Sequence, residues 1–123
     1  MIIDRLSIEY PKIWSPNDDL AGVWEALLEN DSVVAVDEQG RLKGLWLAEV
    51  VEPMQREFEN DLQMIMDDLV SLPVTYVNDH IFLAARVIPM ADEYIGVLEP
   101  DDRFKGLIRV EELKSYIIEG LNL

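Results

Sequence analysis

The chain of 123 residues contains no cysteine and a single histidine, His80. Without cysteine it has no disulfides, no thiolate metal ligands and no cysteine nucleophile, and a reducing, cytoplasmic location is expected. No apolar run approaches the roughly 20 residues that a membrane-spanning helix needs, and the first residues lack the pattern of a signal peptide. His80 falls at an expected helix start and has no second histidine beside it, which favours a structural role over a metal or general-base role.

Basic residues are scarce: 10 Lys and Arg stand against 25 Asp and Glu, a net charge of −15. This charge repels nucleic-acid phosphates and anionic membranes, so neither is expected as a partner. A few local Arg or Lys side chains could still hold the phosphate of a nucleotide. The sequence has no phosphate-binding loop, dinucleotide-binding glycine motif or serine-hydrolase motif, and it therefore predicts a protein that is not an enzyme.

Acidic residues occur in three adjacent pairs, Asp18-Asp19, Asp67-Asp68 and Asp101-Asp102. Their expected places are a helix cap, a helix and a turn, which explains each pair locally. A divalent cation needs several converging oxygens, and no EF-hand spacing is present. We predict no metal site.

A short motif occurs twice: residues 41–45 read Arg-Leu-Lys-Gly-Leu, and residues 103–107 read Arg-Phe-Lys-Gly-Leu. Gly44 and Gly106 are 62 positions apart (106 − 44 = 62). Each copy follows a short apolar run and an acidic turn. This internal repeat predicts one chain built from two similar halves.

The first half shows alternating strand and helix patterns. Asn17 or Asp18 is the expected N-cap of its first helix, and the buried face of that helix is predicted to consist of Leu20, Val23, Trp24, Leu27 and Leu28. Trp14, Trp24 and Trp46 are expected in the core. The predicted elements are a strand at 12–14, a helix at 20–28, strands at 33–36 and 42–47, and a short helix at 49–51.

A connecting helix at 56–69 precedes a second half in the same order. Asn78-Asp79 is its expected helix cap. Pro89 occupies the position equivalent to Leu27 (89 − 62 = 27), so the first helix of this half should end or kink there. The predicted elements are strands at 74–77, 94–98 and 104–108 and helices at 82–88 and 111–119.

The run from Ser15 to Val51 resembles a CBS domain. The matching parts are Ser15-Pro16-Asn17-Asp18-Asp19-Leu20, Val33-Val34-Ala35-Val36-Asp37 and Gly40-Arg41-Leu42-Lys43-Gly44-Leu45. The second half matches through Tyr94 to Leu113, so the resemblance covers nearly the whole chain. It implies a stand-alone CBS pair, or Bateman module: an α+β fold of tandem β-α-β-β-α repeats, with two small sheets flanked by helices and a pseudo-two-fold relation.

The expected domains are a first repeat with an N-terminal lead-in (1–55), a connecting helix (56–70) and a second repeat (71–123). The resemblance also implies a cleft between the repeats that binds AMP, ADP, ATP or S-adenosylmethionine as a regulatory ligand, with no catalytic cofactor. Nucleotide-binding relatives carry Thr or Ser after the second hairpin strand and, three residues later, an Asp that accepts ribose hydrogen bonds.

The chain departs from that pattern in both halves. The first half has Leu47 and Val50 at these positions, and neither side chain can accept a hydrogen bond. The second half has Arg109, which could pair with a phosphate through its planar fork, and Glu112, which could accept from a ribose. Both could equally be surface residues at a helix start.

Two further residues complete the candidate ligand-binding set. Trp14 precedes the Pro16 turn and could stack on a ligand ring, and Thr75 lies on the first strand of the second half. The methionines Met54, Met64, Met66 and Met90 could line an adaptable groove, although such residues more often fill a core.

The sequence therefore predicts a regulatory sensor that binds a small ligand, with an adenine nucleotide as the leading candidate. The alternative is a ligand-free dimerisation or protein-interaction module, and a third possibility is an unrelated α/β enzyme with a deep pocket. We expect a homodimer, and the protein partner that it would regulate is unknown. The predicted exposed apolar faces are Val50-Val51 with Met54, and Tyr116-Ile117 with Leu121.

Overall fold

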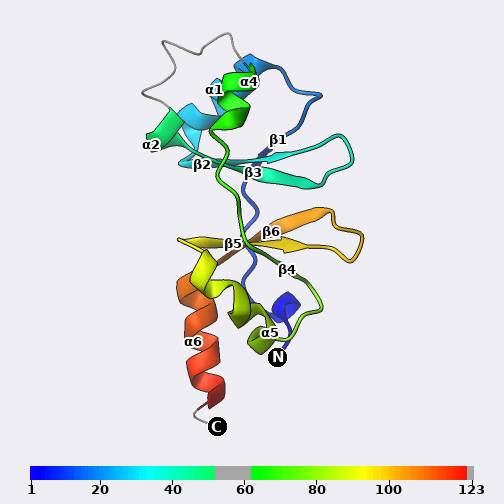
Figure 1. Cartoon of the computed structure of the whole chain (residues 1–123), viewed down its shortest axis with the longest axis vertical. Coiled ribbons are helices and arrows are strands. Elements are labelled where there is room, and N and C mark those ends of the chain that lie inside the picture. The colour runs from blue at the N-terminus through cyan, green and yellow to red at the C-terminus, as the bar shows by residue number, and fades with distance from the viewer. Residues whose placement is uncertain (52–61, 122–123) are drawn as a thin grey trace. The chain divides into compact units, whose positions relative to one another are not determined.

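The computed structural model describes residues 1–51 and 62–121. They form two compact units, a first unit of Pro11–Ser71 and a second unit of Met1–Tyr10 with Leu72–Leu123. Each unit contains one three-stranded mixed sheet with helices packed on it (Figure 1). The predicted α+β fold with two small sheets is confirmed.

The first unit has the strand order β1-β2-β3, with β1 parallel and β3 antiparallel to β2. Its core joins Trp14, Trp24 and Trp46 with the apolar face of α1, and all three indoles are buried as predicted. Its elements are β1 (Lys12–Trp14), α1 (Leu20–Glu29), β2 (Ser32–Val36), β3 (Leu42–Leu47), α2 (Ala48–Val51) and α4 (Leu62–Asp67).

The second unit repeats this topology in the order β4-β5-β6. Its core is purely aliphatic among the buried residues and joins the central strand β5 and the outer strand β6 to α5 and α6. Its elements are η1 (Ile3–Arg5), β4 (Val74–Tyr76), α5 (Ile81–Ala84), η3 (Ala85–Met90), β5 (Tyr94–Leu98), β6 (Phe104–Arg109) and α6 (Val110–Leu121).

The repeat extends to every strand boundary. The strands of the second unit begin and end 62 residues after their counterparts, as with β5 and β2 (94 − 32 = 62). Each hairpin has its register irregularity at the same place, between Ala35 and Val36 and between Val97 and Leu98. The β-α-β-β-α prediction for each half is confirmed.

Each sheet is extended by a segment that, along the chain, comes just before the first strand of the other unit. Val70 pairs with Leu45 on β3, and Glu9 pairs with Leu107 on β6, each by two backbone hydrogen bonds of 2.8–2.9 Å. Residues 1–10 therefore pack in the second unit, and not with the first repeat as the sequence predicts. The Glu9–Leu107 pairing joins residues far apart in the sequence, so no local sequence pattern predicts it.

Two helix caps differ from the prediction by one or two residues. Asp19, not Asn17 or Asp18, caps α1 and accepts from Gly22 N at 2.9 Å, while Asp18 accepts from Ser15 N. His80, not Asn78-Asp79, caps α5 by accepting from Phe82 N at 3.2 Å. Any oxygen or nitrogen acceptor near a helix start can cap it, so the sequence left several choices.

The helix faces bring one confirmation and one correction. The α-helix of the second half ends at Ala84 and continues as the 3₁₀ segment η3, which contains Pro89, as the proline predicted. Leu28 was predicted to be buried, yet it is 73% exposed, while Leu27 is 8% exposed. The buried face of α1 consists of Val23, Trp24, Ala26 and Leu27, and Leu28 lies outside it near the end of the helix.

The predicted connecting helix is described only in part: α4 covers Leu62–Asp67 and the residues before it lie outside the described ranges. Within the described residues, no helix combines the length and hydropathy that crossing a membrane would require.

Candidate ligand-binding site

Arg109 ends β6, directly opposite Tyr94 on β5. Its guanidinium lies 5.1 Å from the centre of the Tyr94 ring, donates from Nη1 to Glu93 Oε1 at 3.0 Å, and places Nε 3.1 Å from Glu9 Oε2. Tyr94 and then Glu9 raise the pKa of Arg109 above its ordinary value. Arg109, the residue expected to pair with a phosphate, thus has two carboxylate partners, Glu9 and Glu93.

Glu112 lies in the first turn of α6, where a carboxylate suits the positive end of the helix dipole. Its Oε1 accepts from the backbone N–H of Ser7 at 3.3 Å. Ser7 and Glu9 both belong to the N-terminal segment, residues 1–10, so Arg109 and Glu112 contact the same segment within the second unit.

Thr75 is buried, with 3% of its surface exposed. Its hydroxyl donates to Asp79 Oδ2 at 2.8 Å, and the same oxygen accepts from Tyr76 N at 2.8 Å. These bonds fix the turn that follows β4. The hydroxyl hydrogen of Thr75 is thus used inside the protein.

Trp14 is 4% exposed and lies in the first unit. Its ring meets Trp46 edge to face at a centroid distance of 5.5 Å, and its Nε1 donates to Asp19 O at 3.1 Å. Its remaining surface lines two hollows, one of about 320 Å³ beside α1 and one of about 460 Å³ beside the β2–β3 turn. Ring stacking by Trp14 stays a prediction.

The equivalent positions in the first unit carry no polar group. Leu47 is half-buried at the end of β3, and Val50 is 45% exposed on α2. The two units thus differ where their repeats would be expected to bind the same ligand.

His80 serves as the cap of α5, and its ring lies 5.0 Å from that of Phe82. In the part of the chain that the structure describes, no three His, Asp or Glu side chains are grouped so that they could hold a metal ion. Asp102, from one of the acidic pairs, adopts a positive φ of 70° at the β5–β6 turn and accepts from the Tyr76 hydroxyl. Gly40 has φ 82° at the equivalent place.

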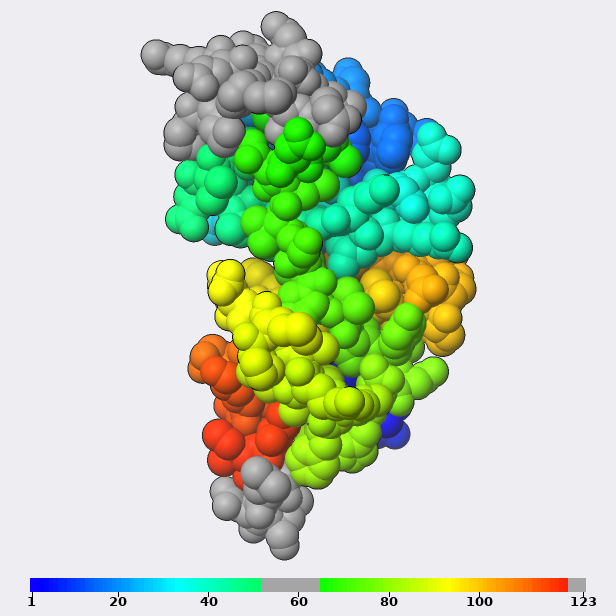
Figure 2. Space-filling model, viewed as in Figure 1, coloured from blue at the N-terminus to red at the C-terminus, as the bar shows by residue number. Residues whose placement is uncertain are grey.

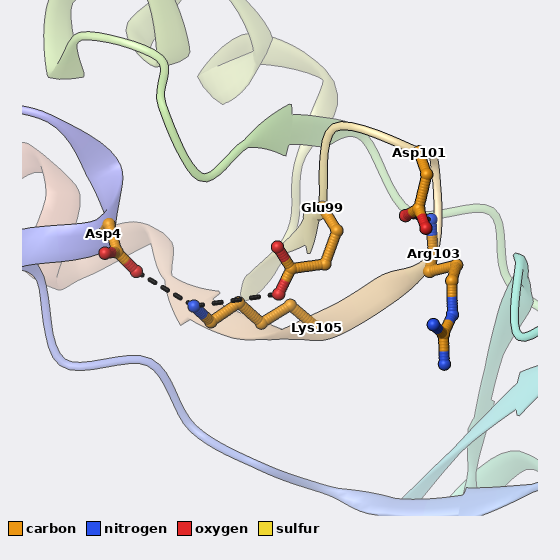
Figure 3. Close-up of polar contacts among 5 residues, drawn as sticks. All are labelled: Asp4, Glu99, Asp101, Arg103 and Lys105. Atoms are coloured by element: carbon orange, nitrogen blue, oxygen red, sulfur yellow. Dashed lines mark hydrogen bonds and ion pairs between the residues drawn. The ribbon is translucent and has the colours of Figure 1, made fainter.

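A second ion-pair group lies along β6. Lys105 places Nζ 2.9 Å from Asp4 and 3.8 Å from Glu99, while Arg103 points away from it (Figure 3). The hydrogen bond to Asp4 raises the pKa of Lys105. The sequence predicts neither this group nor the carboxylate partners of Arg109. Each includes a residue of the N-terminal segment, Asp4 or Glu9, whose position depends on long-range pairing.

The predicted exposed apolar faces are only partly exposed. Val51 is fully buried, and Tyr116 and Ile117 pack partly against the core. The exposed apolar side chains of the second-unit helices are instead Phe82, Leu83, Met90 and Ile118. Figure 2 shows these helices side by side on one face of their unit, α5 and η3 in green and yellow and α6 in orange to red.

The described methionines are divided between core and surface. Met66 packs against the core and lines the 460 Å³ hollow, whereas Met90 is 68% exposed. Met54 lies outside the described residues, as do the side chains of Met64 and Leu121.

No protein-family model matches the sequence, and no curated protein matches it. Solved structures do. A CBS-domain pair with bound AMP from Klebsiella pneumoniae has a TM-score of 0.72 at 11% identity, with 95% of this chain and 98% of that chain covered.

Two further structures show the same similarity over nearly their whole lengths. A CBS domain-containing protein of unknown function from Bacillus anthracis has a TM-score of 0.70 at 16% identity, covering 97% of this chain and 94% of that one. A CBS domain pair/ACT domain protein from Thermotoga maritima has a TM-score of 0.64 at 14% identity, covering 98% and 99%. The chain has the fold of a CBS domain pair.

Proposed function

We propose that this chain is a regulatory module that binds a small ligand of the adenosine class and catalyses no reaction. The observation that carries the proposal is the whole-length similarity to the Klebsiella pneumoniae pair, whose structure contains AMP. The order of elements and the 62-residue repeat support it, because they form the tandem β-α-β-β-α arrangement expected of such a pair. Binding would act by changing the stability or geometry of the pair.

The second unit is the better candidate for ligand contact. Glu112 carries a carboxylate acceptor suited to ribose hydroxyls, and Glu112 and Arg109 each contact the N-terminal segment, at Ser7 and at Glu9. Leu47 and Val50 leave the first unit without either function, and an unpaired buried hydroxyl would cost about 1–3 kcal/mol there. We assign the ribose contact to Glu112.

A thermal-shift panel tests this proposal. The ligands are adenosine, AMP, ADP, ATP, S-adenosylmethionine, NAD and guanine nucleotides. A ligand at about 100 times its dissociation constant adds about 2.7 kcal/mol, which raises the melting temperature of a chain of this length by several degrees. Glu112→Ala should remove the shift, whereas Arg103→Ala, on the exposed β5–β6 turn, should keep it.

A shift that survives Glu112→Ala would contradict the ribose assignment. No shift with any ligand would contradict the proposed function itself and favour the alternative, a ligand-free dimerisation or protein-interaction module. One observation favours that alternative: Arg109 already has two carboxylate partners. The homodimer remains a prediction, which sedimentation equilibrium across a concentration series would test, and the cytoplasmic location also remains one.

A further inference from the structure

The charges around Arg109 are unusual for a group expected to meet a phosphate. Glu9 lies 3.1 Å from its Nε and Glu93 lies 3.0 Å from its Nη1. Two carboxylates against one guanidinium leave a net charge of −1 on this cluster. Glu112 binds the same N-terminal segment through Ser7 and adds a further negative charge.

The two carboxylates are held in different ways. The backbone of Glu9 pairs with Leu107 in both directions, its side chain is 43% exposed, and its Oε2 atom is buried and accepts no hydrogen bond within the described residues. Glu93 is 63% exposed but makes a hydrogen bond to Arg109, and its backbone carbonyl accepts from Val110 N at 2.9 Å. A phosphate at Arg109 would therefore meet two carboxylates that already contact the guanidinium.

The two lysines of the second unit already lie beside carboxylates. Lys105 is paired with Asp4 and Glu99 (Figure 3), and Lys114 lies 4.0 Å from Glu111. The net charge of −15 adds a repulsive background for any anion. The electrostatics of this surface thus oppose phosphate, although its hydrogen-bonding groups suit a nucleoside.

We propose that Glu9 and Glu93 make the site beside Arg109 and Glu112 select nucleosides with uncharged or cationic substituents over nucleotides. This inference rests on the proposed function and names its ligand class. Arg109 then serves to hold the two carboxylates in place and does not bind phosphate. Glu9 and Glu93 are the residues that determine specificity.

Adenosine and AMP form a matched pair of probes, because they differ only by the phosphate. We would measure their dissociation constants by calorimetry at low ionic strength in the wild-type chain and in Glu9→Gln, Glu93→Gln and Glu111→Gln. Wild type should bind adenosine more tightly than AMP. Each of the first two variants should shift the ratio toward AMP by about fivefold, the effect of one charge at 4 Å in a water-like dielectric.

Glu111→Gln is the control, since it removes one charge from an exposed site that does not touch Arg109, and it should leave the ratio unchanged. AMP binding as tight as adenosine in wild type, or an unchanged ratio in both Glu9→Gln and Glu93→Gln, would overturn the selectivity while leaving the proposed function intact. If no variant binds either probe, the proposed function fails and the selectivity fails with it. Circular dichroism of each variant confirms that the fold is retained.

Discussion

The backbone of Glu9 passes so close to Gly106 that a Cβ on the glycine would lie 2.7 Å from the Glu9 carbonyl oxygen. The first unit contains the same relation: a Cβ on Gly44 would lie 2.9 Å from the carbonyl oxygen of Val70. The glycine of the repeated Arg-x-Lys-Gly-Leu motif is thus needed where a further backbone segment, at Glu9 or at Val70, pairs with the hairpin. A motif that first indicated a repeat also marks the point of this long-range pairing.

Gly106→Ala should lower the free energy of unfolding by about 1–3 kcal/mol, because the added methyl would overlap Ile8 as well as Glu9. Urea denaturation gives the change. The control is Gly22→Ala, whose Cβ would meet nothing closer than 3.6 Å on α1 and should stabilise the helix by about 0.5–1 kcal/mol. Equal effects of the two substitutions would show that Ile8 and Glu9 do not pack tightly against Gly106.

Adjacent leucines on α1 offer a test of how that helix packs. Leu27→Ala should cost about 2–5 kcal/mol, because this side chain belongs to the core of the first unit. Leu28→Ala should change the free energy of unfolding by less than about 0.5 kcal/mol, because its side chain is largely exposed. Chemical denaturation of both variants compares them directly, and a larger loss at Leu28 would mean that another surface covers it in solution.

Asp37 should make the stability of the first unit depend on acidic pH. Its Oδ1 accepts from the N–H groups of Arg41 and Gln39, both at 2.9 Å, and the bond from Arg41 is the main reason that its pKa lies below 3.8. A carboxyl whose pKa is depressed by folding stabilises the protein above its unfolded pKa, and this contribution is lost as the pH falls through the folded pKa.

The difference in urea midpoint between wild type and Asp37→Ala should therefore be constant from neutral pH down to about 3.8 and should shrink below that value. Glu38→Ala removes the exposed neighbouring carboxylate and serves as the control for net charge. A gap that stays constant well below pH 3.8 would mean that the carboxylate form of Asp37 does not stabilise the turn.

The sequence by itself determined the local elements and their repetition. Apolar periodicity and β-branched runs predict α1 and the strands to within a few residues, and the spacing of Gly44 and Gly106 predicts the repeat, because these signals arise within one element. Pro89 likewise predicts where the helical segment of the second half ends, and η3 stops one residue later, at Met90, because the missing N–H of proline acts on the preceding turn.

Only the tertiary structure decided which segments meet. Residues 1–10 pack in the second unit, and they bring Glu9 to Arg109, Ser7 to Glu112 and Asp4 to Lys105 across about 100 residues of sequence. These contacts depend on where the N-terminal segment packs, and its sequence has no periodic pattern that predicts this. The sequence could therefore name Arg109 and Glu112 but not their partners. The charge that the site presents to a ligand depends on those partners and is therefore a property of the fold.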